Sequence, residues 1–267
     1  MIYVCIPSYN EAPTIGLLLW KIRQVFAGFQ REYQLLVLDD GSTDATGEVL
    51  ERYVRVLPLS VTRHPERRGY AQSVEELLRQ AVDRTDRPKR DCAILMHGDF
   101  AHGPNFIPDL VRRIESGADI VVAQGKLEGE SSRARRWARR LAPVLLRGVV
   151  RVPGVSDVVS GFSVFRLVTL RNAFRSAPGL LLTTEGWTAN AELYARTARY
   201  ARRVETISAV ERGDLRQRDS RVNSWEAALK VWSSRRTLRR TSPPPPAHAA
   251  DSATAREAEN QPEVASR

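Results

Sequence analysis

Two adjacent carboxylates follow an apolar run near the start of the chain, and their type and spacing suggest chemistry. Asp39 and Asp40 come directly after residues 35–38 (Leu-Leu-Val-Leu), and residues 41–44 (Gly-Ser-Thr-Asp) follow them. The run is typical of a buried parallel strand, so the acids are expected at its carboxyl end, where open α/β sheets bind ligands. Carboxylates and hydroxyls there can hold a base edge, a ribose or a metal-bound phosphate. The pattern equally suits a turn and a helix N-cap within residues 42–44.

An earlier strand-like segment ends in a second polar loop. Residues 2–7 (Ile-Tyr-Val-Cys-Ile-Pro) are mostly apolar, residues 8–11 (Ser-Tyr-Asn-Glu) are polar, and a helix is predicted from Pro13 to Phe26. Strand, loop, helix, strand, acidic loop and helix make a βαβ unit with both loops at one sheet edge. We therefore predict an α/β fold with a mostly parallel central sheet flanked by helices.

Together the two loops resemble the inverting glycosyltransferases of family 2. Residues 6–11 (Ile-Pro-Ser-Tyr-Asn-Glu) and 39–44 (Asp-Asp-Gly-Ser-Thr-Asp) carry the resemblance, which within that family is to the dolichol-phosphate-mannose-synthase-like branch. The resemblance implies a GT-A-type nucleotide-binding fold, a nucleotide-sugar donor and transfer with inversion. It also implies that the nucleotide sugar is bound by Pro7, Tyr9, Glu11, Asp39 and Asp40.

The apolar run 92–96 ends in His97, Gly98 and Asp99. In the family this place usually carries Asp-x-Asp, whose acids hold a divalent cation against the sugar diphosphate. The cation neutralises the charge that develops on the leaving group. Asp99 matches the second acid and His97 replaces the first; a neutral imidazole can bind Mn²⁺, whereas Mg²⁺ prefers oxygen ligands. The resemblance thus implies a divalent metal, Mg²⁺ or Mn²⁺, with Asp99 as catalytic residue and main ligand and His97 as the second ligand.

Two arginine-containing segments are candidates for phosphate contacts. Arg68 and Gly69 lie where the family has a glycine-centred loop against the nucleotide; glycine permits close approach and arginine offsets phosphate charge. Residues 216–221 resemble the branch's Arg-x-Gly-x-Ser segment, so Arg216 and Arg218 are predicted to face a lipid phosphate or the diphosphate. The first segment is equally typical of a loop that precedes a helix, and the second is equally typical of a solvent-exposed loop.

Later segments are candidates for the sugar and acceptor side. Residues 157–162 (Asp-Val-Val-Ser-Gly-Phe), followed by Arg166, resemble an element that lines that side in the branch. On this resemblance Asp157 is a catalytic candidate, and Ser160 and Arg166 are acceptor or phosphate candidates. Asp157 could equally hold a buried turn, and Arg166 could be a cation that precedes a helix. Glu192, with Glu185, is the candidate base that a hydroxyl acceptor would need.

Length and charge agree with one such domain. The chain has 267 residues and a formal charge of +10, carried mostly by arginine. A basic protein attracts polyanions, but no nucleic-acid module is visible, so we favour a phosphate-bearing substrate at a membrane surface. Genomic base composition alone could also explain the arginines.

Cys5 and Cys92 lie in apolar patterns and are predicted to be buried free thiols.

The chain carries no stretch of the roughly 18 to 20 apolar residues that span a bilayer. Residues 131–141 place Trp137 opposite several arginines on a helical wheel, which suits either a helix at headgroup level or an ordinary surface helix. We predict peripheral attachment to an anionic membrane. No signal peptide is recognised, so the expected location is the cytoplasm, with the inner face of the cell membrane included.

Residues 1–240 are predicted to form the glycosyltransferase domain, and 241–267 a disordered tail rich in proline and alanine.

The function we expect is sugar transfer from a nucleotide sugar to a polyprenyl phosphate, with inversion. An acceptor phosphate is already ionised near neutral pH, so this reaction needs no strong protein base. One alternative is transfer to a soluble hydroxyl acceptor. The other is a non-catalytic nucleotide-sugar-binding module whose metal site was lost when His97 replaced the first acid.

Overall fold

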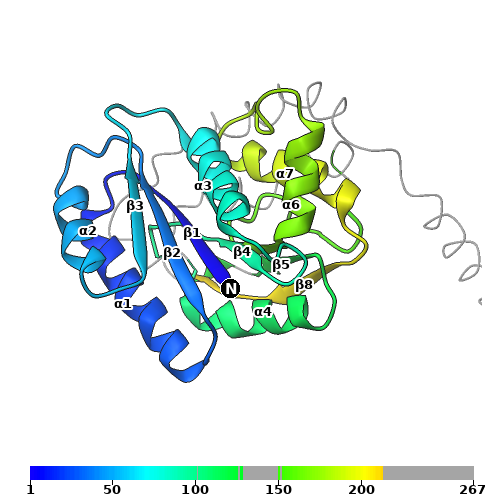
Figure 1. The fold of residues 1–267 in the computed structure, drawn as a ribbon, viewed down its shortest axis with the longest axis horizontal. Helices are drawn as coiled ribbons and strands as arrows, with labels where there is room; N and C mark the ends of the chain where they lie inside the picture. The colour runs from blue at the N-terminus through cyan, green and yellow to red at the C-terminus, as the bar shows by residue number, and fades with distance from the viewer. Residues whose placement is uncertain (101, 126, 129–149, 151, 213–267) are drawn as a thin grey trace, which may run out of the picture.

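The computed structural model describes residues 1–100, 102–125, 127–128, 150 and 152–212. Within them a seven-stranded sheet has the strand order β3-β2-β1-β4-β7-β5-β8 (Figure 1). Its strands are β1 Ile2–Ser8, β2 Tyr33–Asp39, β3 Leu59–Arg63, β4 Cys92–Leu95, β5 Ile120–Gln124, β7 Ser163–Arg166 and β8 Val204–Ser208. A second sheet pairs β6 (Leu127–Glu128) with β9 (Glu211–Arg212).

Strand direction decides which loops meet. Strand β7 is antiparallel to its neighbours β4 and β5, and the other neighbouring pairs of this sheet are parallel. The carboxyl ends of β1 to β5 therefore lie at one edge of the sheet together with the start of β7, and we call this the carboxyl edge. The predicted mostly parallel α/β sheet is confirmed.

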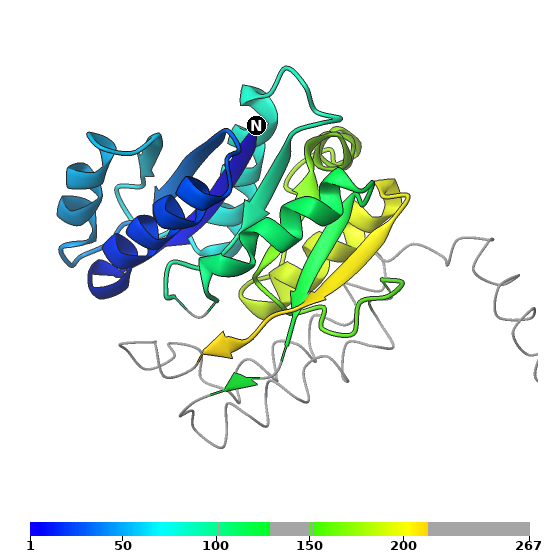
Figure 2. The same cartoon turned by 90° about the horizontal axis from the view of Figure 1, so that it is seen from below.

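Helices cover both faces of the sheet. They are α1 Ala12–Gly28, α2 Thr46–Val54, α3 Tyr70–Arg84, α4 Ile107–Glu115, α6 Leu167–Ser176 and α7 Trp187–Thr197, with short 3₁₀ helices η1 Pro104–Phe106 and η2 Ala198–Tyr200. Apolar side chains of α1, α2 and α4 pack on one face, and those of α3, α6 and α7 on the other. Figure 2 shows the blue helix α1 and the green helix α4 along the first of these faces.

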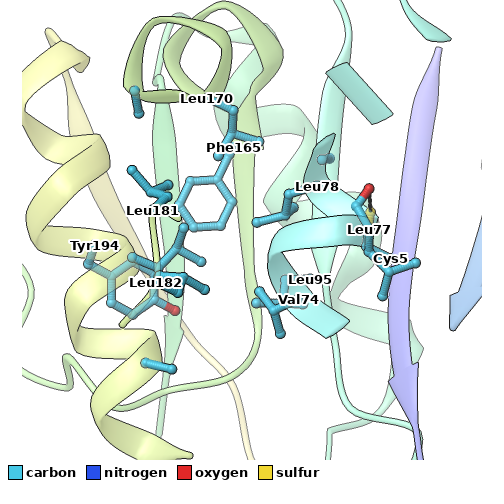
Figure 3. Close-up of a cluster of buried hydrophobic side chains, with 14 of the residues drawn as sticks. Cys5, Val74, Leu77, Leu78, Leu95, Phe165, Leu170, Leu181, Leu182 and Tyr194 are labelled. Carbon is cyan, nitrogen blue, oxygen red and sulfur yellow. Dashed lines mark hydrogen bonds between the residues drawn. The ribbon is translucent and has the colours of Figure 1, made fainter. Parts of the chain in front are cut away.

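Alternation along the strands divides the core into two layers. In β1, Tyr3 and Cys5 face the α3 side, while Val4 and Ile6 face the α1 side. Figure 3 shows Cys5 directed at the backbone of Leu77 in α3, whose carbonyl oxygen accepts from its Sγ at 3.7 Å. Both cysteines are buried and free, as predicted. Burial raises the pKa of Cys92 to about 12, so its thiol stays protonated and unreactive.

Three predictions fall on parts of the chain that the structure does not describe. The arginine-rich segment around Trp137 and the tail 241–267 both lie outside the described residues, as do Arg216 and Arg218. Among the helices that are described, none has both the length and the apolarity needed to cross a bilayer.

Candidate functional site

The loops that follow β1 and β2 are joined into one unit at the carboxyl edge. Asn10 N–H donates to Ser42 Oγ at 2.8 Å, and Asn10 Oδ1 accepts from Thr43 N–H at 2.7 Å. Glu11 N–H donates to Thr46 Oγ1 at 2.8 Å. The structure thus brings together the two segments that carry the resemblance and links them by hydrogen bonds.

A row of polar side chains crosses three strands at this edge. Ser8, Asp39 and Arg63 are register partners on β1, β2 and β3. Ser8 Oγ and Asp39 Oδ2 are buried and have no hydrogen-bond partner in the described part of the chain, although the Arg63 guanidinium lies 3.3 Å from Asp39 Oδ2. Buried polar atoms without hydrogen bonds are rare in folded proteins. A polar ligand that displaces the half-exposed Arg63 side chain could satisfy both atoms.

Asp40 shapes the loop between β3 and α3. Its Oδ1 accepts from Arg68 N–H at 2.8 Å, its Oδ2 accepts from Gly69 N–H at 2.9 Å, and its Oδ1 also lies 2.8 Å from His64 Nδ1. The structure therefore brings together Asp40, Arg68 and Gly69, as predicted for one site. It does so through the backbone of the loop, while the Arg68 side chain is exposed.

The same loop packs tightly on the acidic turn. Gly41 has a φ of +68°, and a Cβ there would lie 2.6 Å from the carbonyl carbon of Glu66 and 2.7 Å from Arg67 N. A side chain at this position is therefore excluded both by backbone conformation and by space. The Arg67 guanidinium stacks over the Tyr9 ring at 4.4 Å, so the loops after β1, β2 and β3 form one continuous surface.

The loop after β4 completes this surface. Thr14 Oγ1 lies 2.9 Å from Gly98 O and 3.2 Å from Glu11 Oε2 and can donate its one hydrogen to either, which places Glu11 beside the backbone next to Asp99. The His97 ring stacks on Tyr70 with centroids 5.1 Å apart. Pro7, Tyr9, Glu11, Asp39, Asp40, Arg68, Gly69, His97 and Asp99 thus all lie at the carboxyl edge.

The donor set at the end of β4 fits a cation that is held mainly by the substrate. In the described residues no three acidic, histidine or cysteine side chains gather as a metal cluster. Mg²⁺ and similar ions are commonly bound by one or two carboxylates plus substrate phosphates, and the half-buried Asp99 fits that role. His97 fits less well, because a Cβ at Gly161 would overlap its Nε2, so that nitrogen is packed against the loop before β7.

Ser160 and Asp157 shape the turn that precedes β7. Ser160 Oγ donates to Ala123 O at 2.7 Å, and Ser160 O accepts from Tyr194 Oη at 2.6 Å. Asp157 Oδ1 accepts from Val159 N–H at 3.2 Å. Both residues lie at the carboxyl edge, but the buried Ser160 hydroxyl is already used within the fold. Of the two roles expected for Asp157, catalysis or holding a turn, this geometry favours holding the turn.

Arg166 is not part of this site. It lies at the far end of β7, paired in register with Cys92 at the start of β4. Its guanidinium donates to Asp119 Oδ1 at 3.0 Å and to the carbonyl oxygens of Lys89, Ile114 and Ala118. Because β7 is antiparallel, only its first residues reach the carboxyl edge. Of the two roles predicted for Arg166, the structure contradicts the phosphate contact and supports a structural cation.

Glu192 is buried and fully engaged with the backbone before α7. Its Oε2 accepts from Thr183 N–H and Thr184 N–H at 2.8 and 2.9 Å, and Arg196 lies 2.7 Å from its Oε1. Glu75 on α3 likewise accepts from the N–H groups of Leu181 and Leu182. Four consecutive amides of this irregular segment are therefore held by two buried carboxylates. The predicted catalytic role of Glu192 is not favoured, because no part of its carboxylate faces solvent.

The segment ends at Glu185, the other predicted base. Glu185 Oε2 accepts from Ala71 N–H at 3.2 Å, and its carboxylate lies against Gly69. The side chain is exposed at the carboxyl edge, so the structure brings Glu185, unlike Glu192, to the loop that follows β3.

We expect Glu192→Gln to lower stability rather than to act on catalysis selectively. The amide oxygen can keep the N–H groups of Thr183 and Thr184, which both bind Oε2, but the NH₂ group then replaces Oε1 and turns its hydrogens toward the Arg196 guanidinium. Leaving a partly buried donor unsatisfied costs about 1–3 kcal/mol. Thermal unfolding should show the loss, and kcat at a temperature where the variant is folded should remain within a few-fold of the original. A loss of kcat by orders of magnitude without loss of stability would restore a catalytic role.

Sequence reasoning missed three residues that organise the site: His64, Tyr70 and Asn190. Tyr70 Oη donates to Asn190 Oδ1 at 2.8 Å, and Asn190 Nδ2 donates to Val159 O at 3.2 Å. Tyr70 thus links α3 to the turn before β7. For His64 a signal existed, because it is the first residue after β3 and so lies at the carboxyl edge.

Similarity to known proteins identifies the family of this chain. The family model described as glycosyl transferase family 2 matches residues 3–174. A dolichol-phosphate mannosyltransferase of Pyrococcus furiosus is 27% identical over 168 residues, which are 61% of this chain and 45% of that protein. An undecaprenyl-phosphate 4-deoxy-4-formamido-L-arabinose transferase of Proteus mirabilis is 26% identical over 147 residues, 55% of this chain and 42% of that protein. The matched part is thus less than half the length of either relative.

Solved structures share the fold. Glucosyl-3-phosphoglycerate synthase from Mycobacterium tuberculosis, in complex with phosphoglyceric acid, superposes with a TM-score of 0.62 at 18% identity, covering 92% of this chain and 81% of that one. The same enzyme with Mn²⁺, UDP-glucose and phosphoglyceric acid gives a TM-score of 0.59 at 17% identity, with coverage of 92% and 81%. These likenesses establish the GT-A fold. With the family model matched over most of the described residues, the chain belongs to glycosyl transferase family 2.

Proposed function

We propose that this protein is an inverting glycosyltransferase that takes a sugar from a nucleotide sugar and transfers it to a polyprenyl phosphate. The observation that carries the proposal is the convergence of the acidic turn, the Gly69 loop and Asp99 at one sheet edge. In open α/β sheets, nucleotides bind in the crevice at the carboxyl ends of the strands. Membership of glycosyl transferase family 2 supports the same reading.

The nucleotide half of the donor belongs over β1, β2 and β3. Ser8 Oγ and Asp39 Oδ2 supply a hydroxyl and an acceptor that lack hydrogen bonds. The Tyr9 ring lies under the exposed Arg67 guanidinium, which places an aromatic surface and a cation beside them. A base edge or ribose could satisfy the first pair, and the diphosphate could draw Arg67 or Arg68 to it.

A divalent cation held by Asp99 and the diphosphate would neutralise the charge on the departing nucleotide. Asp99 would fix the cation at the middle of the edge, between the nucleotide region and the turn before β7. Glu11 would hold that loop in place through Thr14 and Gly98. The Mn²⁺ present with UDP-glucose in the mycobacterial structure supports a metal requirement for the proposed reaction.

The acceptor is inferred from the relatives' names, which specify dolichol phosphate and undecaprenyl phosphate. A phosphate oxygen can attack without a protein base, which agrees with the structural role found for Glu192. A soluble hydroxyl acceptor remains the alternative, and Glu185 is then the exposed carboxylate to test. Docking of the protein at an anionic membrane surface is part of the proposal, because a polyprenyl phosphate resides there.

A donor screen tests the proposed function directly. Release of nucleoside diphosphate from UDP- and GDP-sugars should require both a divalent cation and a polyprenyl phosphate, and the product should have the inverted anomeric configuration. Heat-treated protein and a non-phosphorylated polyprenol are the controls. Turnover with a sugar or glycerate hydroxyl and none with the lipid phosphate would establish the alternative acceptor. Nucleotide binding without turnover under every condition would instead indicate a non-catalytic module.

A further inference from the structure

His64 lies between two carboxylates from different elements. It is 4% exposed, with Nδ1 2.8 Å from Asp40 Oδ1 and Nε2 2.9 Å from Glu76 Oε2 on α3. Its backbone N–H donates to Asp39 O at 2.9 Å, which fixes the residue to β2. An imidazole can donate from both nitrogens only when it is protonated. A ring that meets an ionised carboxylate on each side is therefore expected to be an imidazolium.

The carboxylate beside Nδ1 is the one that shapes the Gly69 loop. Asp40 also accepts from Arg68 N–H and Gly69 N–H. Gly69 has a φ of +110°, and this loop has no regular structure until α3 begins at Tyr70. Its backbone course therefore depends on Asp40, and the position of the Asp40 carboxylate depends on the buried ring beside it.

We propose that His64 is a positioning residue for nucleotide binding. As an imidazolium it holds the Asp40 carboxylate between β2 and α3, and through Asp40 it sets the backbone of Arg68 and Gly69 at the nucleotide region. The inference rests on the proposed function, because that function assigns the loop to the donor. His64 itself contacts neither the donor nor the reacting atoms; it acts through Asp40.

The charged groups with the largest effect on the ring are Asp40 in the turn after β2, Glu76 on α3 and Arg68 in the loop. Burial disfavours the imidazolium, and so does the Arg68 charge, but the hydrogen bonds to Asp40 and Glu76 outweigh them and raise the pKa of His64 above its ordinary value of 6.5. A raised pKa means that the contribution of the charged ring is present below pH 6.5 and is lost as the pH rises through the folded-state pKa, because a neutral ring can donate to only one of the two carboxylates. Nucleotide affinity should therefore weaken toward alkaline pH.

The first test follows the ligand-free protein by NMR from about pH 6 to about pH 10. The ring resonance of His64 and the amide resonance of Gly69 should titrate with one midpoint above 6.5. In His64→Asn, whose amide can still donate to Asp40 but cannot titrate, the Gly69 resonance should lose that midpoint. If the Gly69 amide shift did not change at the pH where His64 titrates, the proposal would be overturned.

Glu76→Gln provides an independent variant that keeps the histidine. A neutral imidazole can accept at Nε2 from the glutamine amide, so the ring no longer needs its second proton. The midpoint of both resonances should then move to lower pH. Glu51→Gln, at an exposed acid on α2, is the matched control and should leave the midpoint unchanged. An unchanged midpoint in Glu76→Gln would show that the contact between His64 and Glu76 does not stabilise the charged ring, and would contradict the proposal.

The second test measures binding of UDP and of GDP by calorimetry across the same pH range. We expect affinity to fall about tenfold through the His64 midpoint, as for the loss of one charge-assisted hydrogen bond. His64→Asn should bind with an affinity that does not change at that midpoint. A dissociation constant independent of pH, in a protein whose His64 titrates, would refute the positioning role. If neither nucleotide binds at any pH, the proposed function fails, whereas the coupling of His64 to Gly69 is still decided by the resonances.

Discussion

Asp99→Asn is expected to lower sugar-transfer turnover by about 10²–10³-fold, the range typical of losing one group that stabilises transition-state charge. Asparagine has nearly the same shape but lacks the charge that a divalent cation needs. Because the side chain lies at the carboxyl edge and is only half-buried, the variant should unfold at nearly the same temperature. Initial rates at saturating donor, measured over a range of Mn²⁺ and Mg²⁺ concentrations, provide the measurement.

Asp109→Asn is the matched control for this experiment. Asp109 is an exposed acid on α4 that pairs with Arg112. Its replacement should leave both turnover and metal dependence unchanged. Near-normal activity of Asp99→Asn, or full activity of the unmodified protein in EDTA, would show that Asp99 does not hold a required cation. Partial rescue of Asp99→Asn by high Mn²⁺ would support the assignment.

Asp40→Ala should produce the largest combined loss of stability and binding. The change leaves two loop N–H groups and the His64 ring without their shared acceptor. Removing one partner of a buried, charged hydrogen-bonded group typically costs about 3–5 kcal/mol. Chemical denaturation should show that loss, and UDP or GDP affinity should fall at least about tenfold under conditions where the variant is folded.

Asp83→Ala controls for the removal of a carboxylate as such, since Asp83 is exposed near the end of α3. It should change neither stability nor nucleotide affinity beyond a few tenths of a kcal/mol. If Asp40→Ala kept normal stability but lost nucleotide binding, Asp40 would contact the nucleotide directly rather than through the loop. Unchanged binding in that variant would remove Asp40 from the site.

The part of the site built on parallel strands could be predicted from the sequence. Apolar runs that end at Pro7, Leu38 and Met96 imply strand ends, and strands that run the same way place their loops at one edge. Arg166 could not be placed in this way, since a motif carries no information on strand direction. Strand β7 runs opposite to its neighbours, so Ser160 lies at the carboxyl edge and Arg166 at the other.

Buried polar contacts were the second limit of prediction. Glu192 stands in a helix whose pattern does not reveal that its carboxylate turns back onto the amides of Thr183 and Thr184. The partner at His64 Nε2 likewise comes from α3, twelve positions further along the chain. Such contacts depend on how helices pack on the sheet, which periodicity alone does not determine.

The irregular segment before α7 connects two helices, α3 and α7, that lie far apart in the chain. Glu75 on α3 holds the amides of Leu181 and Leu182, and Glu192 on α7 holds the next two; Figure 3 shows both leucine side chains directed into the core between these helices. Opening either helix would release half of the segment and expose that core. Local unfolding in proteins proceeds in such contiguous cooperative units. We therefore expect α3, which follows the Gly69 loop, and α7, whose Tyr194 hydroxyl binds Ser160 O, to open as one unit, so that a change that loosens one helix also loosens the other.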